Sequence, residues 1–169
     1  MTSLSLSRIK IDAKQGTVFL VLLIAMSIVP LIRVQLVSGM LVNTMLFLAV
    51  SYIGKRAGFA LSILPSLIAF WVGLVPAVAL PFIPWIMASN VLLVAVFAAA
   101  QNSHSIVRYG TSVAAKGIFL VLFGSLVGAL FGGTSFVHIL STMFGWIQFV
   151  TAGAGAVLAY TMLRVTRKA

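Results

Sequence analysis

Three side-chain amides lie inside long apolar stretches of this sequence. Asn43, Asn90 and Gln148 are flanked by aliphatic and aromatic residues, as in FGWIQFVTAGAGA, residues 144–156. A buried amide needs a hydrogen-bond partner, because leaving it unpaired in an apolar environment is costly. An amide also donates and accepts at once, which suits a heterocyclic or amide-bearing small molecule. The three residues therefore indicate either hydrogen bonding between helices or a pocket for such a molecule.

Three further residues are candidates for the same substrate-binding pocket. Thr151 shares a helical face with Gln148, and Trp85 follows a proline-rich segment from which its ring could stack on a ligand. Lys116 leaves two alternatives open. It can extend to water from one turn inside its helix, or it can turn into the bundle, where its charge would favour an anionic ligand group.

Groups that perform catalysis are missing from the sequence. The only acid is Asp12, there is no cysteine, and the two histidines, His104 and His138, fall in segments predicted on opposite sides of a membrane. Neither a nucleophile elbow, Gly-x-Ser-x-Gly, nor a phosphate-binding Gly-x-x-x-x-Gly-Lys loop is present. We therefore expect no catalytic residues, no metal site, no cofactor and no enzymatic activity. A pump driven by protons or sodium usually has an intramembrane acid, and this chain has none.

The composition is that of a membrane protein. Of its 169 residues 62% are hydrophobic and 7% charged, and the mean hydropathy is +1.23. Its 11 Lys and Arg residues punctuate apolar runs rather than cluster on a polar face. That distribution is a signal of membrane topology, so we expect membrane lipid around the chain and no nucleic acid as a partner.

Apolar stretches near the roughly 20 residues of a spanning helix predict an all-α, multi-pass bundle in a single integral membrane domain, residues 1–169. A polar segment, 1–16, precedes the six-helix bundle, 17–163, and a basic tail, 164–169, follows it. The six predicted spans are 17–36, 39–53, 57–75, 84–100, 112–131 and 139–163. Two outer loops, PAVALPFIP (76–84) and GGTSFVH (132–138), are either a shaped lid or ordinary tight turns.

The charged residues orient this bundle. With six spans, every basic residue except Arg33 falls on one side, which the positive-inside rule assigns to the cytoplasm together with both termini. Asn43, Asn90 and Gln148 then lie about 6–13 Å below the outer helix ends, at 1.5 Å per residue. Sharing one depth, they favour a small-molecule pocket that opens to the outside of the cell membrane.

Small residues recur at four-residue spacing in the last two predicted spans. The pairs are Gly124 with Gly128 and Ala152 with Ala156. Such spacing lets helix backbones approach closely in lipid. The contact is either packing within the chain or a face that docks a partner protein.

Several of these segments together resemble a known family. In order they are SGMLVNTMLFLA (38–49), Pro65, Gly73 and Pro76, PFIPWIMASNVLLVAVF (81–97), AAKGIFL (114–120) and WIQFVTA (146–152). The series resembles the substrate-binding S components of energy-coupling factor transporters. That resemblance implies six helices, capture of a vitamin or related micronutrient from outside, and docking on a transmembrane scaffold subunit driven by two cytoplasmic ATPase subunits.

The first predicted span departs from the family. Many members have an Ala-x-x-x-Ala docking pattern there, whereas TVFLVLLIAMSIVP, residues 17–30, contains only Ala25. Two alternatives remain beside the transporter subunit. One is a self-sufficient permease, which would transport without an ATPase. The other is a structural membrane protein, whose amides would pair from helix to helix.

Overall fold

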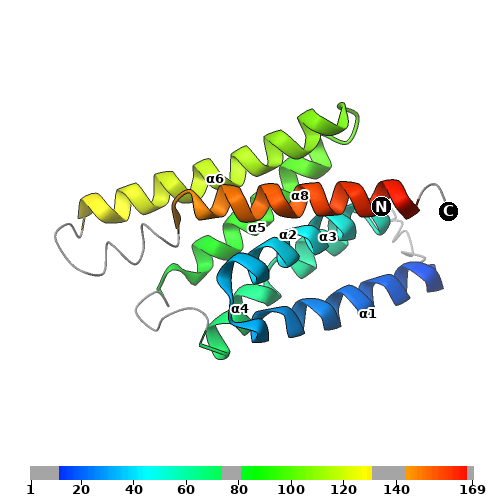
Figure 1. Ribbon diagram of the computed structural model, residues 1–169, viewed down its shortest axis with the longest axis horizontal. Coiled ribbons are helices and arrows are strands. Elements are labelled where there is room, and N and C mark those ends of the chain that lie inside the picture. The colour runs from blue at the N-terminus through cyan, green and yellow to red at the C-terminus, as the bar shows by residue number, and fades with distance from the viewer. Residues whose placement is uncertain (1–11, 74–80, 131–143, 167–169) are drawn as a thin grey trace, which may run out of the picture.

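The computed structural model describes residues 12–73, 81–130 and 144–166, and within them every regular element is a helix, as predicted (Figure 1). The predicted loop 132–138, most of the loop 76–84 and the first residues of the sixth span lie outside the described residues. The elements are α1 (Ala13–Ile28), the 3-10 helix η1 (Val29–Ile32), α2 (Gln35–Tyr52), α3 (Lys55–Leu61), α4 (Leu64–Trp71), α5 (Ile83–Ala99), α6 (Ser105–Leu130) and α8 (Ile147–Thr166).

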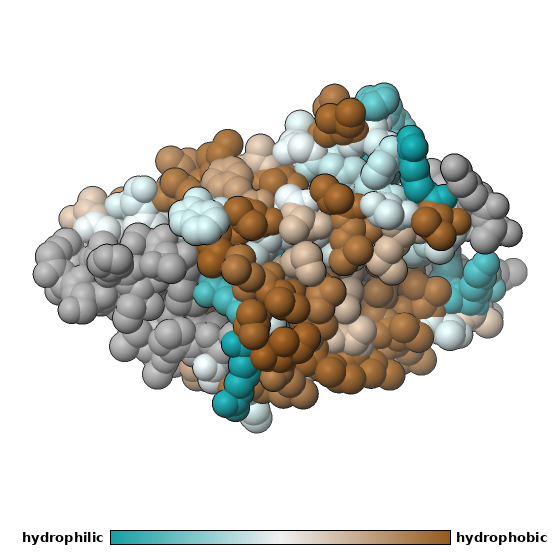
Figure 2. Space-filling view, in the orientation of Figure 1, coloured by the Kyte–Doolittle hydropathy of each residue, from teal (hydrophilic) through white to brown (hydrophobic). Residues whose placement is uncertain are grey.

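Four of these helical stretches are long and apolar enough to cross a membrane. They are Ala13–Ile32, which joins α1 to η1, together with α2, α6 and α8, while α5 is apolar but shorter. Apolar side chains cover much of the visible flank of the molecule in Figure 2, and hydrophilic residues gather toward the end where α8 finishes. These features are consistent with a multi-pass membrane protein.

Prolines cause two differences between the observed helices and the predicted spans. The first span ends as an α-helix at Ile28, because Pro30 lies in the first turn of η1 and Arg33 then adopts a left-handed φ of 57°. The third span is two helices, since the chain turns at Ser62 and Pro65 occupies the first turn of α4. Proline is favoured at a helix start and disruptive in a helix interior, so both breaks have a local cause.

The helices place several basic residues at one end of the molecule. A cavity of about 380 Å³ there is lined by the last turns of α2 and α8 and by the α5–α6 junction, including Arg108 and Arg164. The Tyr52 hydroxyl at the end of α2 lies 2.6 Å from the Thr166 hydroxyl at the end of α8. The start of α1 and the end of α8 also lie at this end in Figure 1. Arg33 follows η1, beyond the opposite end of α1.

Among the described helices, α2 and α8 make the most extensive contact. A methyl group added at Gly155 would lie 2.8 Å from the Met40 carbonyl oxygen and 3.0 Å from the Thr44 amide nitrogen. The Thr44 hydroxyl donates to the Gly155 carbonyl oxygen at 3.3 Å. Ala152 and Ala156 are buried beside this glycine. Small residues on α8 therefore allow the two backbones to touch, as close packing in lipid requires.

We expect Gly155→Ala to lower the free energy of unfolding by about 1–3 kcal/mol, the usual range for overpacking. The added methyl group would meet backbone atoms of α2, which have no freedom to move aside. Gly153→Ala is the matched control, because nothing lies within 4 Å of its added methyl group. Reversible unfolding in mixed detergent micelles measures both. Equal stability of the two variants would contradict this account of the α2–α8 contact.

Candidate functional site

Lys116 is a buried cation in the middle of α6. Its side chain is only 4% exposed, although the predicted helix start at residue 112 placed it within one turn of water. The helix begins instead at Ser105, which puts Lys116 about 16 Å along it at 1.5 Å per residue. Of the two alternatives open from the sequence, the structure therefore has the lysine turned into the bundle.

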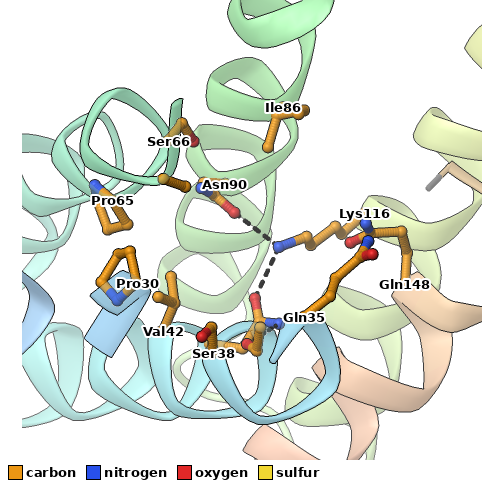
Figure 3. A pocket seen from close by; sticks show the side chains of 13 residues that line it. Pro30, Gln35, Ser38, Val42, Pro65, Ser66, Ile86, Asn90, Lys116 and Gln148 are labelled. Atoms are coloured by element: carbon orange, nitrogen blue, oxygen red, sulfur yellow. Dashed lines mark hydrogen bonds between the residues drawn. The ribbon is translucent and has the colours of Figure 1, made fainter. Parts of the chain in front are cut away.

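Two asparagines from neighbouring helices hold the Lys116 ammonium group. Its Nζ donates to Asn43 Oδ1 on α2 at 2.7 Å and to Asn90 Oδ1 on α5 at 2.6 Å (Figure 3). The asparagine NH₂ groups point the other way, since Asn43 donates to the Gly39 carbonyl oxygen at 2.8 Å and Asn90 to that of Ser62 at 3.2 Å. Each amide is thereby fixed with its oxygen toward the lysine.

No carboxylate neutralises this lysine. The only acid of the chain, Asp12, is exposed and precedes α1. The two asparagines offer oxygen dipoles but no net charge, and an ammonium group has three N–H donors. Within the described residues Lys116 makes two hydrogen bonds, both to asparagines. In its ammonium form the lysine therefore has a third N–H donor without an acceptor among the described residues, and no acid of the chain balances its charge.

Beside the ammonium group lies a cavity of about 110 Å³. Its walls come from η1, α2, α4, α5, α6 and α8, so that helices far apart in the sequence meet around it. The polar residues of its lining are Gln35, Ser38, Asn43, Ser66, Asn90, Lys116 and Gln148, and the apolar ones include Pro30, Val42, Pro65, Ala69 and Ile86. A small polar or charged group with an apolar body fits such a lining.

The two helix breaks border this cavity. Pro30 of η1 and Pro65 of α4 both line it, so the chain bends away from straight helix where the hollow lies. The Ser38 hydroxyl donates to the Val29 carbonyl oxygen at 3.1 Å and ties α2 to η1. The Ser62 carbonyl oxygen, at the α3–α4 break, is the acceptor for Asn90. The breaks therefore shape the cavity and also supply partners to its polar groups.

Four of the six predicted substrate-binding residues lie together. Asn43, Asn90, Lys116 and Gln148 all line the cavity, so the three amides and the lysine lie near one another. Gln148 already has a contact within the chain. The side-chain oxygens of both asparagines bind the lysine. Their main contact is therefore Lys116, and not a ligand as the sequence suggested.

Trp85 and Thr151 lie elsewhere, contrary to the prediction. The Trp85 ring stacks on Phe123 of α6, with centroids 4.3 Å apart, and is outside the cavity lining. The Thr151 hydroxyl donates to the Gln148 carbonyl oxygen at 3.3 Å, and its side chain packs against Gly39 where α8 meets α2. Helical spacing predicted which helices contain these residues, but it did not predict which neighbouring residues their side chains contact.

The sequence reasoning missed Gln35, Ser38 and Ser66. Gln35 and Ser38 lie on the same face of α2 as Val42 and Asn43. Ser38 is one turn before Val42, and Gln35 is two turns before it. The spacing i, i+3, i+7, i+8 of these four residues predicts that they share a helix face. The predicted span began only at residue 39, so it did not include Gln35 and Ser38. Ser66 had no such signal, because its orientation depends on the break before α4.

Two of the four predicted docking residues are buried within the chain. Ala152 and Ala156 are buried between α8 and α2, so a partner protein could reach them only if these helices parted. For this pair the structure shows the alternative, intramolecular packing. Gly124 packs near Phe144, where an added methyl group would lie 3.1 Å from the Phe144 Cβ atom. Gly124 and Gly128 are both partly exposed on α6.

No protein-family model, curated protein or solved structure matches this chain.

We expect Lys116 and Asn90 to be energetically coupled. Asn90→Leu removes an acceptor from a buried charge and should cost about 1.5–3 kcal/mol of stability. In a Lys116→Met background the same change should cost much less, because no charge is left unpaired. Reversible unfolding of the four proteins in this double-mutant cycle gives the coupling energy. The matched control is Ser89→Ala, since its hydroxyl donates only to the Ile86 carbonyl oxygen of its own helix. Additive effects of Lys116→Met and Asn90→Leu would contradict the contact.

Proposed function

We propose that this chain is a membrane-embedded substrate-binding subunit that captures a vitamin or related small micronutrient from outside the cell. The observation that carries the proposal is the convergence of Lys116, Asn43, Asn90 and Gln148, from four helices, on one cavity inside an apolar bundle. Ionisable residues within membrane segments are expensive and usually functional. Here the ionisable residue borders a space that can hold a ligand.

The arrangement supports binding better than a purely structural role. If the amides served only to join helices, they would pair with one another or with backbone groups and leave no charge between them. Instead two oriented amide oxygens stabilise an ammonium group. A buried charge adds little or nothing to stability compared with a well-packed apolar residue. A lysine at this depth is therefore better explained by what it binds than by what it stabilises.

Uptake would require a partner that supplies energy. The sequence contains no phosphate-binding loop, and its one acid lies outside the helices. Both features agree with the resemblance to S components, in which a transmembrane scaffold and two ATPase subunits drive release. The partly exposed glycines of α6, Gly124 and Gly128, are the remaining small-residue candidates for docking that scaffold.

The proposal includes a topology with both termini in the cytoplasm of a prokaryotic cell. The end of the bundle that holds Lys55, Arg108 and Arg164 would then face inward, in agreement with the positive-inside rule. The end of α1 followed by Arg33 would face outward.

We expect the protein purified in mild detergent to retain a small molecule that untargeted mass spectrometry detects. Lys116→Met should lose that molecule while remaining folded. Lys14→Met is the matched control, because Lys14 is exposed at the start of α1. Equal retention by both variants, or no molecule specific to the wild-type protein, would count against capture in this cavity. Accumulation of the molecule in vesicles by this chain alone would favour the permease instead.

The topology can be tested by single cysteines, because the chain has none of its own. Ser103→Cys, an exposed position between α5 and α6, should react with a membrane-impermeant maleimide only after the cells are opened. Val34→Cys, exposed between η1 and α2, should react in intact cells. The reverse pattern would invert the orientation, and labelling of both from outside would exclude the predicted spans.

A further inference from the structure

We propose that the ligand of the Lys116 cavity is a compact monoanion, with a carboxylate group that pairs with the lysine Nζ. This inference rests on the proposed function and adds the chemical class of the ligand. The inference is based on the lysine charge, which no acid of the chain balances, and on a cavity beside the lysine that has room for a small ligand.

The charge balance around Lys116 is incomplete without a ligand. The ammonium group carries one positive charge inside the bundle, and the chain's single acid is exposed before α1. The Asn43 and Asn90 oxygens reduce the energetic penalty of burying the charge but cannot cancel it. A hydrogen bond between ionised groups is shorter and stronger than one between neutral groups, and low surrounding polarity strengthens the attraction further. An anion therefore gains far more here than a neutral molecule of the same shape.

The geometry directs that interaction into the cavity. The two asparagines fix the position of the Nζ atom, and within the described residues two of its three N–H donors are used. In Figure 3 the lysine side chain extends toward Asn90, and Ser66, Pro65 and Pro30 lie beyond the tip of the lysine. Ser66 is buried, lines the same cavity and makes no hydrogen bond within the part of the chain described. Lys116 and Ser66 are therefore two hydrogen-bond donors in the lining of the cavity that a carboxylate could use.

The number of charges and the size of the cavity narrow the ligand class. One fixed positive charge matches one negative charge, so a dianion such as hydrogen phosphate would remain half neutralised. A volume of about 110 Å³ is below the roughly 300–1,000 Å³ of sites for drug-sized ligands. The apolar walls formed by Val42, Pro65 and Ile86 suit a short aliphatic or single-ring body. A small carboxylic acid combines these properties.

The test compares carboxylates with their uncharged amides on the full-length protein in detergent at constant ionic strength. The probes are acetate, propionate, butyrate and benzoate, each beside its amide, and inorganic phosphate. Shifts of the melting temperature with concentration give the affinities by linkage. At least one carboxylate should bind about 10-fold or more tightly than its amide, the effect of one charge-assisted hydrogen bond.

Two substitutions at the lysine keep the test decisive if one of them fails to fold. Lys116→Met removes the charge and the donor, whereas Lys116→Gln removes the charge but keeps an N–H donor, on a side chain that is one atom shorter. Both should abolish the preference for carboxylates, and Lys14→Met should preserve it. Absence of any preference in the wild-type protein, or its persistence in the Lys116 variants, would overturn the inference. Tighter binding of phosphate than of every carboxylate would overturn the assignment of a monoanion.

Failure of this inference can be distinguished from failure of the proposed function. If the purified protein retains a neutral molecule that Lys116→Gln also retains, capture stands and the charge pairing is wrong. If the protein retains nothing but prefers carboxylates through Lys116, the anion site stands and micronutrient capture loses its support.

Discussion

The burial of one ammonium group without a compensating acid is the constraint on which the arrangement of this protein depends. Lys116 lies near the middle of α6, too far from either end of that helix to reach water. Its charge must be stabilised where it lies, and among the described residues its hydrogen-bond acceptors are two amide oxygens. These amides must in turn have their NH₂ groups occupied, or their oxygens would not be held toward the lysine. The Gly39 and Ser62 carbonyl oxygens meet that requirement.

The backbone must bring Asn43 and Asn90 within hydrogen-bond distance of the same lysine. Asn43 faces the lysine from a helix that α8 approaches to backbone contact, which Gly155 permits. Asn90 needs a carbonyl oxygen from another helix, and the interruption between α3 and α4 presents that of Ser62. The same interruption brings Pro65 and Ser66 to the cavity wall. The irregular parts of the bundle are thus those that serve the lysine and the space beside it.

The sequence predicted the helical architecture and grouped Asn43, Asn90 and Gln148, which line one cavity, because apolar stretches and the polar residues within them are local properties. It misplaced Lys116, since Arg108 looked like a loop residue and the helix was started after it. The structure includes Arg108 in α6, where its Nε donates to the Phe97 carbonyl oxygen at 2.9 Å and its guanidinium group stacks 3.7 Å from the Phe97 ring centre. Such tertiary contacts are invisible to periodicity, as is the stacking that removes Trp85 from the pocket.

The position of the lysine between two helix pairs bears on how a ligand would leave. The main packing partner of α2 is α8, and that of α5 is α6, and the two pairs are joined by the contact of α6 with α8 and by a smaller contact of α2 with α5. Lys116 of α6 bonds Asn90 within its own pair and Asn43 in the other. An anion paired with the lysine would add contacts across this junction, so binding would hold the two pairs together and release would have to separate them. The only acid of the chain, Asp12, precedes α1 and does not compete with such an anion for the lysine. In the proposed capture subunit, the work of separating the two helix pairs would be done by a partner protein.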